Sequence, residues 1–134
     1  MAEAKSPSDE AHLRKIRLEL ARSKDHVSGW PLDGYEFVAP LGADHHIDVE
    51  AWKQHRALCF VHRIESGATV ERGLLIHRAG GAGGATWAFE YDGDEGEDSG
   101  HRFGAHAFTP GEYVSLRDED GELVTYRVAA VGPA

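Results

Sequence analysis

The stretch EYVSLRDEDGELVTYRVAAV, residues 112–131, decides the fold class of this chain. Apolar and polar residues alternate on both sides of DEDG, and a period of two is typical of strands whose sheet is buried on one face. The Gly-containing turn between the two runs indicates a hairpin. This part of the sequence therefore predicts two antiparallel strands.

The register of this hairpin follows from the faces of its side chains. A two-residue turn would place Val114 opposite Arg127, and core and solvent faces would then be mixed. A shift of one residue pairs Leu116 with Val124 instead and requires a three-residue loop. The sequence therefore predicts that Gly121 has a positive φ, in the G1 bulge that such a loop contains.

Strand-like segments recur along the rest of the chain. They are expected over 13–22, 35–39, 57–65, 70–78, 85–91, 101–108, 112–118 and 122–131. One helix interrupts them, over about 49–56: Asp48 is a good N-cap, and Ile47 and Trp52 have the spacing of a hydrophobic staple. The predicted fold is mainly β, a small antiparallel barrel or rolled sheet of about 6–8 strands with one short helix.

Length and composition predict a single domain. The polar residues 1–11 are expected to form a disordered lead-in, and residues 12–134 of the 134-residue chain to form one mainly-β domain. Cys59 is the one cysteine, which excludes an internal disulfide and a multi-cysteine zinc site, and a buried apolar role is expected for it. The single cysteine fits a reducing compartment, so a cytoplasmic protein is expected. No stretch approaches the ~20 apolar residues of a membrane span, and a soluble protein is expected.

The net charge of −9 comes from two acidic segments. In an antiparallel meander both segments fall at the same end, where they would form an acidic rim. We expect such a rim to collect a cation or a basic protein segment, and the negative charge argues against nucleic-acid binding. DGDEGED does not match the spacing of an EF-hand loop. The predicted rim residues are Asp92, Asp94, Glu95, Glu97, Asp98, Asp118, Glu119, Asp120 and Glu122.

A metal site is the second hypothesis. The histidines of DHHIDVEAWKQH (44–55) lie at opposite ends of the expected helix and do not form a local site. However, plausible strand registers place His77, Glu90 and His106 on one outward face, as a two-histidine, one-carboxylate set, with His45 or His46 near the same end.

A small-molecule carrier is the third hypothesis. Trp87, Phe89 and Tyr91 alternate on one strand and form a broad aromatic face. In a barrel of this size such a face is most simply core, although a larger barrel would leave a cavity for a small apolar ligand. No catalytic residue and no required cofactor is predicted, because no nucleophile motif is present in the sequence.

Three segments resemble a family of small uncharacterised bacterial proteins of about this length. They are HLRKIRLELARS (12–23), GYEFVAPLGADHHIDVEAWKQHR (34–56) and HRFGAHAFTPGEYVSLRDEDGELVTYRV (101–128). The resemblance implies a bacterial, cytosolic, stand-alone domain, and it brings no activity, cofactor or catalytic residue with it. FTPGEYV is also similar to the PGE stretch of cupin barrels, but the cupin metal pattern is incomplete here. The favoured hypothesis from sequence is therefore a non-enzymatic binding or partner module with an acidic rim.

Overall fold

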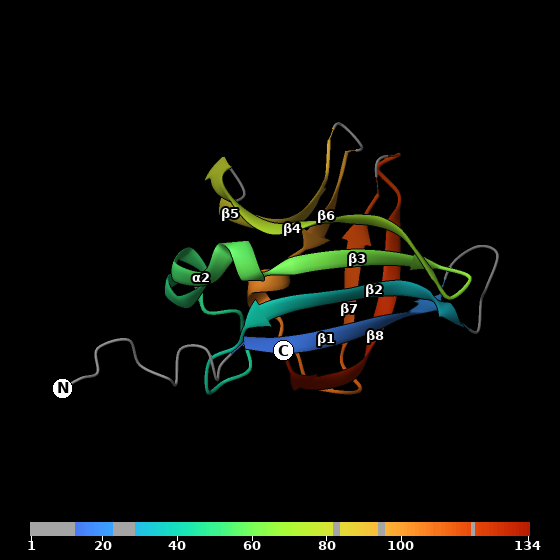
Figure 1. Cartoon of the computed structure of the whole chain (residues 1–134), viewed down its shortest axis with the longest axis horizontal. Coiled ribbons are helices and arrows are strands. Elements are labelled where there is room, and N and C mark those ends of the chain that lie inside the picture. The colour runs from blue at the N-terminus through green and yellow to red at the C-terminus, as the bar shows by residue number, and fades with distance from the viewer. Residues whose placement is uncertain (1–12, 23–28, 82–83, 94–95, 119) are drawn as a thin grey trace.

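The computed structural model describes residues 13–22, 29–81, 84–93, 96–118 and 120–134. Its strands form a closed antiparallel barrel in the order β1 to β8, in which β8 pairs back with β1 (Figure 1). The predicted mainly-β class and the barrel are thus confirmed. The elements are β1 (Leu13–Arg22), β2 (Trp30–Pro40), α2 (Val49–His55), β3 (Phe60–Glu65), β4 (Ala68–Gly81), β5 (Gly84–Tyr91), β6 (Glu97–His101), β7 (Tyr113–Arg117) and β8 (Leu123–Pro133). The predicted lead-in 1–11 lies outside the described residues.

The last hairpin has the register predicted from the sequence. Leu116 lies opposite Val124, and Val114 lies opposite Tyr126. Gly121 has a φ of 81°, in the left-handed region that favours glycine. The alternation of apolar residues therefore determined the pairing correctly, even though the Asp-Gly dipeptide alone suggested a tighter turn.

The helix α2 begins where the sequence predicts. The Asp48 side chain accepts a hydrogen bond from the Ala51 amide at 3.1 Å, and Ile47 and Trp52 are both buried. The Trp52 indole also donates to the Leu75 carbonyl on β4 at 3.0 Å. The helix is thereby attached to one end of the barrel, which we call the helix end (Figure 1).

The strand predicted over 101–108 is wrong. The strand β6 covers Glu97–His101, within the segment predicted as an acidic loop, and Arg102 then adopts a left-handed φ of 55° that ends it. The Phe103 ring folds back over Gly100, where a Cβ atom would lie 2.5 Å from the ring. The apolar residues of this segment therefore fill the helix end instead of alternating along a strand.

The core is aromatic at the helix end. Phe37, Phe89, Phe103 and Phe108 have at most 1% of their surface exposed, and each ring contacts at least two of the other three. Edge and tilted contacts of this kind stabilise a core beyond the area that they bury.

Within the described residues, no helix has the length and apolar character needed to cross a membrane.

Candidate functional site

The interior of the barrel becomes polar at the end opposite α2. Successive strand pairings place Tyr35 opposite Arg63 and Arg63 opposite Glu71, in one row across β2, β3 and β4. On the other side, Tyr126 lies opposite Val114, which is a core residue. Residues that point into the barrel are therefore polar here, whereas the same strands carry apolar residues toward the helix end.

A buried carboxylate lies at the centre of this polar layer. Asp98 is only 5% exposed, and its Oδ2 atom accepts hydrogen bonds from the hydroxyls of Tyr35 and Tyr91, each at 2.7 Å. Asp98 lies opposite Phe89 on β5, so it points into the barrel. Within the part of the chain that the structure describes, Asp98 forms no ion pair. Neutral hydroxyls thus stabilise its charge.

The tyrosines around Asp98 keep their protons at neutral pH. Burial, followed by the neighbouring Tyr126, Tyr91 and Asp98, raises the pKa of Tyr35 well above its ordinary value. Burial also raises the pKa of Tyr126 to about 12, and burial and the Asp98 hydrogen bond raise that of Tyr91. The layer therefore contains protonated hydroxyls, two of which already donate to its one buried carboxylate.

The opposite wall carries a paired cation. The Arg63 guanidinium donates to Glu71 at 2.6 Å and also pairs with Glu65. Arg63 therefore forms its ion pairs with these two carboxylates and not with Asp98.

These residues line a pocket of about 560 Å³ that opens at the end of the barrel, which we call the mouth. Leu116 and Val124 form its apolar wall, and Asp118 and Asp120 lie at its edge. The backbone amide of Asp120 donates to the Asp118 side chain at 3.0 Å, which fixes the turn that carries both aspartates. The mouths of barrels are common sites of ligand binding, and this one combines tyrosine rings with an excess of negative charge.

The predicted rim residues do not all lie at the mouth. Asp118 and Asp120 line the mouth, while Asp92 and Glu122 are exposed. The prediction that Asp98 belongs to an exposed rim is wrong, because β6 begins earlier than expected and turns this side chain into the barrel.

Glu97, the remaining rim residue among those that the structure describes, does not line the mouth. Glu97 pairs with Arg78 on the outer surface. Asp94, Glu95 and Glu119 lie outside the described residues.

The structure does not bring the predicted metal ligands together. His77 lies opposite Trp87, with 4.2 Å between ring centroids, and so it shares the face of the core residue Trp87. Glu90 lies on the other face of β5, where it pairs with Arg78 at 3.4 Å. His106 follows the turn at Phe103–Ala105 and is not part of a strand. The prediction that these three residues share one face is therefore wrong, and the described residues contain no group of three or more His, Cys, Asp or Glu able to hold a metal ion.

The aromatic face of β5 is core. Trp87, Phe89 and Tyr91 are at most 3% exposed. Trp87 packs against Trp52 at 5.4 Å, and Phe89 packs against Phe37 at 4.9 Å between ring centroids. These rings are therefore part of the packed core, which is the simpler of the two interpretations that the sequence allowed.

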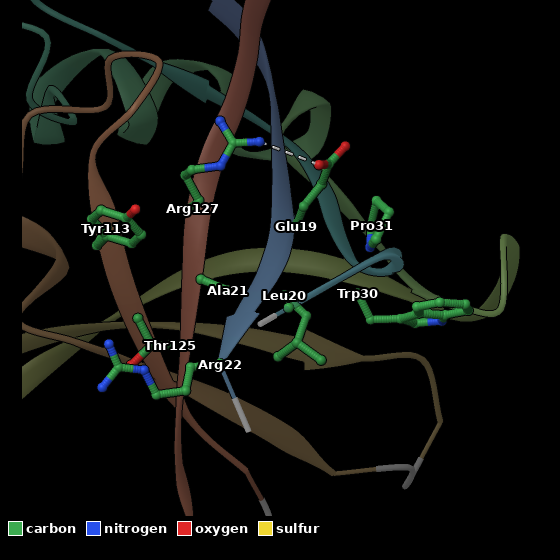
Figure 2. A pocket seen from close by; sticks show the side chains of 10 residues that line it. Glu19, Leu20, Ala21, Arg22, Trp30, Pro31, Tyr113, Thr125 and Arg127 are labelled. Atoms are coloured by element: carbon green, nitrogen blue, oxygen red, sulfur yellow. Dashed lines mark ion pairs between the residues drawn. The ribbon is translucent and has the colours of Figure 1, made fainter. Parts of the chain in front are cut away.

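A second hollow of about 600 Å³ lies on the outer surface of β1, β7 and β8 (Figure 2). The pairing of β1 is irregular on both sides near Leu20, which lines it. Glu19 and Arg127 pair across it at 3.5 Å. Its wall also runs up to Arg22 and Gly29, on either side of 23–28, which the structure does not describe. We therefore take the mouth as the candidate site.

Sequence reasoning missed most of the mouth. Arg63 follows Val61 by two residues, so the alternation of β3 already points it into the barrel. Two polar side chains at inward positions, Arg63 and Glu71, were the signal that would have located the polar layer. Asp98 was hidden because its strand was assigned to a loop.

The comparisons with known proteins add no relative. No family model matches this chain, no curated protein matches it, and no solved structure matches it. The resemblance to a bacterial family therefore remains a prediction.

Proposed function

We propose that the protein is a non-enzymatic binding module whose mouth binds a basic segment of a partner protein. The observation that carries this proposal is the pocket of about 560 Å³ in which the buried Asp98 and the edge residues Asp118 and Asp120 face one opening. With one cysteine, the cytosol is the expected compartment.

The charges at the mouth favour a cationic partner. Arg63 is the cation among its lining residues, and Glu71 and Glu65 already neutralise it. The carboxylates on the other wall and at the edge therefore remain in excess. A concave surface of one sign concentrates oppositely charged segments and accelerates their association.

Binding rather than catalysis fits the chemistry of the tyrosines. Their raised pKa values keep the hydroxyls protonated, so they act as hydrogen-bond donors at neutral pH and not as bases. The tyrosines of the site thus do not serve as bases toward a bound ligand, and Tyr35 and Tyr91 already donate their protons to Asp98.

The test compares two variants that each remove two negative charges. One is Asp120→Asn with Glu122→Gln, at exposed positions of the β7–β8 turn, and the other is Glu50→Gln with Glu112→Gln, at exposed positions elsewhere. The probe is a fluorescent nine-arginine peptide, and its affinity is measured by anisotropy at two salt concentrations. We expect the first variant to bind several-fold more weakly than the second. Equal affinity of the two variants, or no binding by the parent protein, would overturn the proposal.

A further inference from the structure

We infer that the mouth is a socket for a single arginine side chain, whose guanidinium enters the pocket and pairs with Asp98. This inference rests on the proposed function and specifies which group of the basic segment is recognised. The arginine socket depends on residues inside the pocket, whereas the attraction of a basic segment depends on the acidic residues at the edge of the mouth.

The first argument is the state of Asp98. This carboxylate is 5% exposed, and its two hydrogen bonds come from tyrosine hydroxyls at 2.7 Å. A buried charge without a counter-ion is costly, and a cation of good geometry recovers much of that cost. Since Asp98 lines an open pocket, a cationic group of a ligand is able to supply the missing charge.

The second argument is the wall beside Asp98. Tyr35 is 3% exposed and packs against Phe89 and Tyr126, so the half-buried Tyr126 is the ring of this wall that a ligand can contact. Aromatic faces attract guanidinium groups, which are weakly hydrated and stack on rings, whereas the lysine ammonium is more strongly hydrated. Leu116 and Val124 offer an apolar wall to the methylenes of the same side chain.

The third argument is the number of charges. Arg63 is paired with Glu71 at 2.6 Å and with Glu65, so the carboxylates of the pocket that remain for a ligand are Asp98, Asp118 and Asp120. A metal ion is disfavoured, because the described residues hold no cluster of three metal-ligating groups. A single organic cation is therefore the ligand that matches both the negative charge of the pocket and its aromatic and apolar walls.

The experiment titrates the full-length, ¹⁵N-labelled protein with blocked five-residue glycine peptides that carry one central residue. That residue is arginine, lysine or citrulline, which has nearly the shape of arginine but no charge. We expect saturable amide shifts at Tyr35, Asp98 and Tyr126 with the arginine peptide, several-fold weaker binding of lysine, and at least tenfold weaker binding of citrulline. Equal binding of arginine and citrulline would overturn the inference.

The variant Asp98→Asn keeps the shape of the side chain and removes its charge, and we expect it to lose at least tenfold in affinity for the arginine peptide. The control Glu50→Gln removes one charge from the helix end and should bind as the parent does. If Asp98→Asn does not fold, Tyr126→Leu tests the aromatic wall, and an unchanged affinity in that variant would contradict the socket.

Two further outcomes separate this inference from the proposed function. If the nine-arginine peptide binds in a manner that depends on Asp120 and Glu122, while Asp98→Asn has no effect on any peptide, the socket is wrong and the binding module stands. If calcium alone reproduces the shifts at the mouth and the arginine peptide produces none, the socket is wrong and a metal occupies it.

Discussion

The two ends of this barrel use the same eight strands in opposite ways. At the helix end, Trp52 from α2 and the segment carrying Phe103 and Phe108 enter the barrel and pack against its rings. At the mouth, the inward positions carry tyrosines, an aspartate and an ion pair, and a pocket remains open. The comparison indicates that stability comes mainly from the helix end, whereas the mouth retains polar groups that are costly to bury.

The largest expected effect tests the packing of the helix end. Phe37→Ala removes a fully buried ring that contacts Phe89, Phe103 and Phe108, and we expect it to lower the free energy of unfolding by about 3–5 kcal/mol. Urea denaturation measures this loss. Val124→Ala at the mouth serves as the control and should cost clearly less, because this side chain is only half-buried. Equal losses of unfolding free energy in the two variants would contradict the inference that the helix end contributes more to stability than the mouth.

The second prediction concerns the polar network of the mouth. Tyr91→Phe deletes one of the two hydrogen bonds to Asp98, and a bond to a charged acceptor contributes about 1.5–3 kcal/mol. Tyr113→Phe is the matched control, since Tyr113 is 58% exposed and its change should be neutral. If chemical denaturation finds Tyr91→Phe as stable as the parent, the buried carboxylate does not depend on this donor.

The third prediction sharpens the role of Gly100. A Cβ atom there would lie 2.5 Å from the Phe103 ring, so Gly100→Ala should overpack the helix end and cost about 1–3 kcal/mol. Gly132→Ala is the control, because a Cβ at that position meets nothing within 4 Å. The melting temperatures of the two variants give the measurement. A thermal midpoint of Gly100→Ala equal to that of Gly132→Ala would show that Phe103 moves aside without loss.

The smallest expected effect is a pH dependence at the helix end. Burial, followed by the nearby Lys53, lowers the pKa of His77 below 6.5, so folding favours its neutral form. The stability that His77 contributes is therefore present above pH 6.5 and is lost as the pH falls through the lowered pKa of the folded state. Burial also lowers the pKa of His106.

Urea midpoints between pH ~7.5 and ~5 would measure this slope, since histidine titrates in that range. His77→Gln should reduce the slope, while His62→Gln, on β3, is the control. A parent protein whose stability rises on acidification through this range would contradict the assignment.

Local patterns were sufficient for the framework of the fold. The faces of Val114 and Leu116 determined the register of the last hairpin, and Asp48 determined the start of the helix. Alternation failed over 101–108, because Phe103 and Phe108 are apolar for a different reason: they fill the end of the barrel. The position of β6 depends on closure of the whole sheet, and so Asp98 could not be placed from its neighbours in the sequence.

Closure of the barrel has a consequence for how any partner is recognised. Among the described strands, each has a hydrogen-bonded neighbour on both sides, although β4 beyond Leu74 and β8 beyond Arg127 pair as strands on one side only. Addition of a partner strand, which is a common mode of peptide capture, would therefore be confined to such short stretches. At the mouth, recognition would instead depend on side chains, and sequence specificity would come from individual residues of the partner more than from its backbone.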